Sequence, residues 1–278
     1  MGVLALDIGH FGAVMSADSQ PVQILHGSNR VIAGGSLSRN PIVRRVGGGF
    51  RGLTGFVGTE TIDEEPTGEW LEAFGRAHPD ASVGDYSKTL AAELTRQWQR
   101  HGLSSVLEIF VSGVEGAEVR FWYVRNSQGL YDQNFTFKQP SSEFRAVDDL
   151  DQNYIGPNLK AGQSKEQLLQ TRLYSFRQGV LLPAAPVFDA FTGILATIYA
   201  QGIEGFEPVA SLNDLAYLAR QRLEFLKRLY SAKHGIYKKP PAPVDGIVHV
   251  YGVSRHGEIR EYGKHRNQVR ILPLSTVQ

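Results

Sequence analysis

Strand-like and helix-like patterns are segregated along this chain of 278 residues. Short runs rich in Val, Ile and aromatic residues, which favour β-strands, gather in groups separated by helical patterns. They lie at residues 3–7, 13–18, 42–46, 53–57, 106–111, 119–124, 247–253 and 259–262. Apolar residues at helical spacing indicate helices near residues 85–100 and 212–230. We also expect a helix near residues 164–175 and a buried helix at residues 190–201. This segregation favours a layered α+β domain over a parallel sheet built from alternating strands and helices.

Turn and cap residues predict where several of these elements end. Gly9 and Gly12 mark a tight turn that makes the first two strands antiparallel. Gly102 stands where the helix before it would be capped. Ser211 followed by Asp214 is similar to a capping box at the start of the last helix. The sequence therefore predicts boundaries as well as element types.

Composition excludes several classes of function. The chain has no cysteine, which excludes disulfides, thiolate catalysis and Cys-ligated metals. Basic and acidic residues number 29 and 28, and this balance argues against a nucleic-acid binder. No run approaches the ~18 apolar residues that cross a membrane, and the first residues lack the features of a secretory signal. We therefore expect a soluble cytoplasmic protein that binds neither nucleic acid nor membrane.

Two glycine motifs are similar to nucleotide-binding loops. Residues 47–52 fit the G-x-G-x-x-G pattern, but a dinucleotide site needs a helix directly afterwards, and residues 53–58 do not open one. Asp7 and Gly9 resemble the first phosphate loop of sugar kinases and actin-like ATPases, in which backbone amides face phosphate. That family needs a second such loop, and none is evident here. An actin-like or sugar-kinase-like ATP binder stays open as an alternative.

Metal and cofactor motifs have no local support. None of the eight histidines forms an H-x-x-x-H pair or an H-E-x-x-H helix. Acidic residues at 148–151 suit a hard cation, but a solvated loop is the simpler interpretation. We therefore expect no metal and no cofactor.

A set of motifs spread along the chain resembles one family. Residues 12–19, GAVMSADS, resemble the second-strand motif of proteasome and HslV-type subunits. Residues 55–61, GFVGTET, resemble the glycine-containing segment that leads into a helix, expected here around Trp70–Phe74. The later helices and the closing strands keep the family's order along nearly the whole chain, with the poorest match at residues 132–185. The chain thus resembles the N-terminal-nucleophile (Ntn) hydrolase superfamily.

This resemblance implies a fold and an assembly. The fold would be a four-layer αββα sandwich, with two antiparallel sheets face to face between helix layers. Residues 1–278 would form a single domain, with insertions at about 20–41 and 132–185. Members of the family assemble into rings that enclose a proteolytic chamber, so the resemblance implies self-association. It leaves open a catalytic or ATPase partner subunit.

The resemblance also implies a catalytic apparatus, which this chain matches only in part. Active members use an N-terminal Thr or Ser as nucleophile, with its own amine as base, a lysine, an aspartate and an oxyanion-hole glycine. The aspartate matches Asp18 and the glycine matches Gly58. The family's spacing puts the nucleophile at Gly2, which has no hydroxyl. The lysine position falls at Arg44 or Arg45, and arginine cannot shuttle a proton because its pKa exceeds ~12.

We therefore expect a proteasome-like protein that lacks threonine-protease chemistry and serves as a structural or regulatory ring component. One alternative is an active Ntn hydrolase whose nucleophile is not recognisable by motif. Each candidate residue also has a simpler interpretation. Asp18 could cap a strand end, Arg44 and Arg45 could lie at a solvated strand edge, and Gly58 could serve a turn.

Overall fold

A computed structural model gives the fold of the protein. It describes residues 3–18, 22–24, 31–33, 42–46, 49–59, 61–127, 140–179, 185–201, 209–237, 247–263 and 268–272. Gly2 and most of the expected insertion at 20–41 lie outside the described residues.

Most strands belong to two large antiparallel sheets. Sheet I contains, in spatial order, β12 (Tyr174–Gly179), β1 (Val3–Gly9), β2 (Gly12–Asp18), β13 (Val248–Ser254), β14 (Ile259–Tyr262) and β15 (Val269–Ile271). Sheet II contains β11 (Pro140–Val147), β10 (Glu118–Ser127), β9 (Leu107–Glu115), β6 (Arg51–Gly58) and β5 (Ile42–Val46). Two small pairs join β3 (Val22–Ile24) to β4 (Val31–Ala33) and β7 (Thr61–Ile62) to β8 (Glu65–Pro66).

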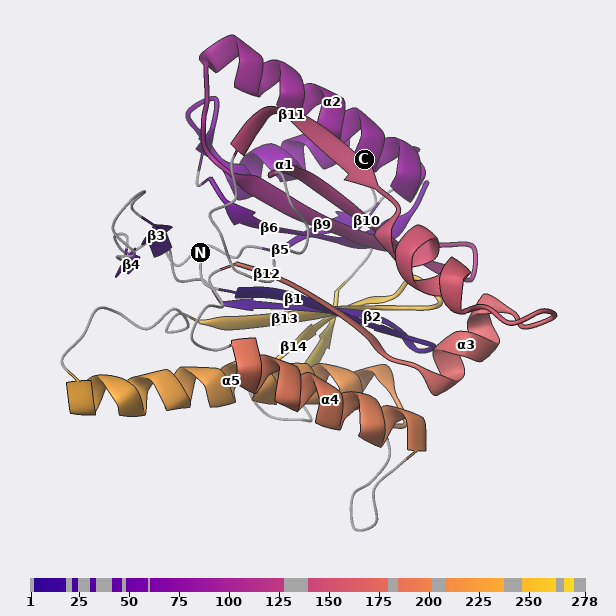
Figure 1. The fold of residues 1–278 in the computed structure, drawn as a ribbon. Helices are drawn as coiled ribbons and strands as arrows, with labels where there is room; N and C mark the ends of the chain where they lie inside the picture. The colour runs from indigo at the N-terminus through magenta and orange to yellow at the C-terminus, as the bar shows by residue number, and fades with distance from the viewer. Residues whose placement is uncertain are drawn as a thin grey trace.

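The longer helices pack on the outer faces of these sheets. They are α1 (Thr67–Ala77), α2 (Val83–His101), α4 (Ala185–Gln201) and α5 (Leu212–Tyr237). Figure 1 shows α1 and α2 over sheet II, and α4 and α5 over sheet I on the opposite side of the molecule. The short α3 (Lys165–Thr171), a π-helical segment at Leu150–Ile155 and a 3₁₀ turn at Gly156–Asn158 lie between β11 and β12 in the sequence. The protein is therefore an α+β fold, as the segregated patterns predict.

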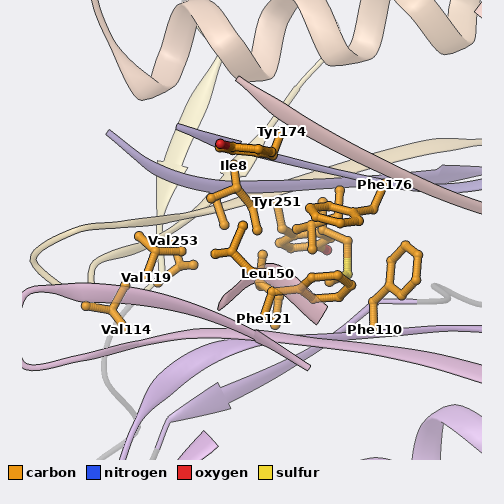
Figure 2. Packing of buried hydrophobic residues seen from close by; sticks show 14 of the residues in the cluster. Ile8, Phe110, Val114, Val119, Phe121, Leu150, Tyr174, Phe176, Tyr251 and Val253 are labelled. Atoms are coloured by element: carbon orange, nitrogen blue, oxygen red, sulfur yellow. The ribbon is translucent and has the colours of Figure 1, made fainter. Parts of the chain in front are cut away.

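Three apolar cores hold these elements together. One lies between the sheets, and Figure 2 shows Phe121 of β10 and Phe176 of β12 meeting there, with ring centroids 4.5 Å apart. A second lies between sheet I and helices α4 and α5, and includes Phe188 and Leu223. The third lies between sheet II and helices α1 and α2, around Trp98. Each sheet therefore buries both of its faces.

Burial on both faces explains the sequence of the first two strands. Alternate residues of β1 point to different cores, with Leu4 and Leu6 between the sheets and Val3 and Ala5 toward the helices. All seven residues of β1 and all seven of β2 are buried. A strand covered on both sides is an apolar run rather than an alternating one, so the sequence pattern of β1 reflects its central place.

Several sequence predictions of local structure are confirmed. The first two strands pair antiparallel, and β5 spans residues 42–46 as expected. Gly102 caps α2 in the left-handed conformation, with a φ of 58°. The last helix extends further than predicted, to Tyr237. The strands that were not expected include residues 140–147 and 174–179, which lie inside the segment 132–185 expected as an insertion and supply an edge strand to each sheet.

Among the described residues, no helix combines the length and the apolar character that crossing a membrane requires.

Candidate functional site

Asp18 lies at the end of β2, beside the beginning of β1. The backbone N–H of Val3 donates a hydrogen bond to its carboxylate, with 2.6 Å between nitrogen and oxygen. Asp18 is 1% exposed. The antiparallel register, with Leu4 opposite Ala17, puts Val3 and Asp18 directly across from each other. The carboxylate thus fixes the first described amide of the chain, one residue after the expected nucleophile position.

Gly58 ends β6 in a conformation that favours glycine. Its φ is +117°, a value that side chains with a Cβ rarely adopt. A Cβ added there would lie 2.1 Å from the carbonyl oxygen of Val106. That carbonyl accepts the N–H of Thr59 at 3.0 Å. The close approach of these two backbones therefore requires glycine at position 58, independently of any role in catalysis.

Contacts between the sheets show which end of the molecule Gly58 occupies. A Cβ added at Gly55 would lie 2.4 Å from the sulfur of Met15 and 2.7 Å from a methyl carbon of Leu4. The side chain of Arg51, at the other end of β6, lies against the turn between β13 and β14. Gly58 therefore lies at the end of the stack where β1 begins, which we call the N-terminal end. Asp18 lies at the same end.

Arg44 and Arg45 lie further along β5. In the β5–β6 register, Arg44 pairs with Leu53 and Arg45 with Gly52. These partners stand five and six positions before Gly58, nearer the opposite end of β6. The backbone register therefore does not bring either arginine beside Gly58. Their side chains lie outside the described part of the structure.

A polar group that no motif indicates also lies at the N-terminal end, in sheet II. The Ser127 hydroxyl donates to the carboxylate of Glu108 at 2.5 Å. Glu108 stands opposite Val57, directly before Gly58 in β6. Burial, followed by the charge of Glu108, raises the pKa of Tyr123 well above its usual range, so this phenol stays protonated at neutral pH. The one signal in the sequence is a charged residue inside an otherwise apolar run, L-E-I-F-V.

Asp7, the acidic residue of the motif similar to a phosphate loop, lies in the core of the protein. Asp7 is fully buried in β1 and accepts hydrogen bonds from Arg222 and from the hydroxyl of Ser175. Its carboxylate is therefore engaged inside the core between sheet I and the helices. Residues 53–58, which follow the G-x-G-x-x-G match, belong to strand β6 (Arg51–Gly58) rather than to a helix. The match at residues 47–52 therefore lacks the helix that its dinucleotide-binding interpretation needs.

The acidic residues at 148–151 are engaged with protein partners. Asp151 accepts a hydrogen bond from Arg120 at 2.6 Å and forms an ion pair with Lys165. Asp149 accepts from the amide of Asn153 at 2.6 Å. In the part of the chain that the structure describes, no three His, Cys, Asp or Glu side chains gather as a metal site would need.

Comparisons with known proteins leave the family open. No family model matches the sequence, and no curated protein is similar enough to count as a relative.

Proposed function

We propose that this chain is a proteasome-subunit-like protein that has lost threonine-protease chemistry and acts as a structural or regulatory component of a ring. Its two facing antiparallel sheets, with helices on both outer faces, support the four-layer αββα sandwich of the Ntn hydrolases. The observation that carries the proposal is the buried carboxylate of Asp18 against the start of β1. Its position at the end of the second strand supports its match to the family's second-strand aspartate.

Loss of the chemistry follows from the residues around that carboxylate. Gly2, at the nucleophile position, offers no hydroxyl to attack a peptide carbonyl. The Asp18 carboxylate accepts a hydrogen bond from the amide of Val3, so this residue stabilises the start of β1. Arg44 and Arg45, the candidates for the lysine, pair along β5 with residues well before Gly58. A scaffold of this kind keeps the architecture and lacks the groups for acyl transfer at the N-terminus.

Peptide turnover tests the loss of activity. We expect the unaltered protein to hydrolyse fluorogenic peptides no faster than an Asp18→Asn variant, which keeps an oxygen that can accept the Val3 amide. Circular dichroism of both proteins checks that they are folded. Turnover that is present in the unaltered protein and lost in Asp18→Asn would refute the proposal, because it would show that the carboxylate supports catalysis.

A further inference from the structure

Ser127 and Glu108 form a hydroxyl–carboxylate pair that the proposed function does not use. The Ser127 oxygen lies 2.5 Å from a carboxylate oxygen of Glu108, and the hydroxyl is the donor. Ser127 is 7% exposed and Glu108 is 3% exposed. A hydroxyl that donates to a neighbouring base is the arrangement that activates serine as a nucleophile.

The backbone around Ser127 is irregular. The pairing of β10 with β11 shifts register between Arg125 and Ser127. Asn126 stabilises this irregularity: it accepts the N–H of Leu107 and donates to the carbonyls of Ser105 and Ser141, at 2.9 Å in each case. Irregularities of this kind redirect side chains and are common beside active sites. In this protein the register shift ends at Ser127, whose hydroxyl contacts the carboxylate of Glu108.

A cationic residue, Arg125, stands across the sheet from Glu108. Arg125 lies directly opposite Glu108 in the β9–β10 register, so their side chains share a face of sheet II. The guanidinium carbon lies 5.1 Å from the centre of the Tyr123 ring, a cation–π distance. A positive charge on this face of the sheet is of the sign that attracts negative charge developing on an acyl oxygen.

We propose that Ser127 is a nucleophile, with Glu108 as its general base, for hydrolysis of carboxylic esters. A carboxylate is a weak base, and an alkoxide leaving group needs less protonation than an amine, so esters suit this pair better than peptides. The inference goes beyond the proposed function, since it needs neither an N-terminal hydroxyl nor Asp18.

The reaction has two balanced stages. The Ser127 oxygen attacks the ester carbonyl while its proton passes to Glu108. The carbon–oxygen bond to the alcohol then breaks, and the alcohol leaves with that proton. In the second stage water attacks the acyl-serine and gives one proton to Glu108. The acid departs as the serine oxygen recovers that proton, and no oxidant, metal or cofactor takes part.

Labelling with a fluorophosphonate probe tests the proposal on the full chain. We expect one adduct per chain by intact mass, mapped to Ser127 by peptide sequencing of the unaltered protein. The adduct should be absent in Ser127→Ala, and labelling should slow by roughly 100-fold in Glu108→Gln. Ser112→Ala is the matched control, because Ser112 is a buried serine of β9 whose hydroxyl bonds a backbone carbonyl at 3.1 Å.

Two results would overturn the inference. One is the absence of any adduct on Ser127 in the folded, unaltered protein. The other is an unchanged labelling rate in a folded Glu108→Gln variant, since the pair would then be a structural hydrogen bond only. Mapping in the unaltered protein does not depend on any variant folding. Neither result bears on whether the chain forms a ring, so failure here and failure of the proposed function are distinguishable.

Discussion

Asp7 and Arg222 form a fully buried ion pair although 215 positions separate them in the chain. The guanidinium donates to both carboxylate oxygens, at 3.1 Å and 2.8 Å. It also lies 4.2 Å from the centre of the Phe188 ring and donates to the hydroxyl of Thr192. One side chain thereby ties α5 to β1 and to α4. The pair fixes how the helices lie on sheet I.

Breaking this pair should destabilise the protein strongly. Arg222→Ala leaves the Asp7 charge buried without its counter-ion, and we expect a loss of about 3–5 kcal/mol in the free energy of unfolding. The double variant with Asp7→Leu and Arg222→Met removes both charges, so it should cost less than Arg222→Ala alone. Urea unfolding of the unaltered protein, Arg222→Ala and the double variant measures these free energies. Arg228→Ala, at an exposed position of α5, is the control. Equal stability of Arg222→Ala and the control would contradict the account.

Gly58→Ala should destabilise the end of β6. The positive φ and the contact with the Val106 carbonyl together predict a loss of roughly 2 kcal/mol. Gly193→Ala is the matched substitution, because Gly193 is an exposed helical glycine with no atom within 4 Å of an added Cβ. It should stabilise the protein by up to about 1 kcal/mol. The two changes should therefore shift the unfolding midpoint in opposite directions, and a shift in the same direction would count against the described backbone.

Asn126→Ala should loosen the N-terminal end of sheet II. The side chain is 2% exposed and satisfies one amide and two carbonyls from neighbouring segments. Its removal leaves these buried polar groups without a hydrogen-bond partner, so we expect the free energy of unfolding in urea to fall by about 3 kcal/mol. Gln99→Ala, at an exposed position of α2, serves as the control and should change little. A cost similar to that of the control would show that water replaces all three contacts.

Stability should fall as the solution is acidified below neutral pH. Burial, followed by the charge of Arg220, lowers the pKa of His249. Because the unfolded histidine titrates near ~6.5, the unfolded chain binds more protons just below that pH, so stability drops as pH falls through it. The decrease in stability ends below the pKa of His249 in the folded protein. Above pH 7 the titration of His249 does not affect stability.

His249→Gln should therefore make the urea midpoint less dependent on pH between 7 and 5. Burial also lowers the pKa of His10, so part of the slope should persist in that variant and a further part should vanish in the double variant with His10→Gln. Identical slopes in the unaltered protein and in His249→Gln would show that His249 titrates alike in both states.

Central elements were predictable from sequence, and edge elements were not. β1 and β2 carry dense apolar runs because both of their faces are buried. β11 begins with a proline and buries only Phe144, and β12 carries Arg177 and Gln178 among its six residues. The alternation in β12 covers only Tyr174 to Arg177, and β11 buries a single apolar residue, so neither pattern is long enough to identify a strand. The sequence therefore suggested an insertion where the structure has one edge strand of each sheet.

The candidate site was predictable only where it depends on local sequence. Asp18 and Gly58 belong to short motifs, and the structure places both at the N-terminal end of the stack. The lysine position was counted back along the chain from Gly58 and stays a prediction; the β5–β6 register sets Arg44 opposite Leu53. The pairing of Ser127 with Glu108 depends on the β9–β10 register, which no local pattern specifies.

Native mass spectrometry of the purified, unaltered protein tests the central claim most directly. A proteasome-like ring component should appear as a closed oligomer of six or seven chains, or a multiple of these, at micromolar concentration. Dilution should leave this species intact, because a ring closes every interface. A monomer or a dimer at the same concentration would contradict the account, since no chamber could then form from this chain.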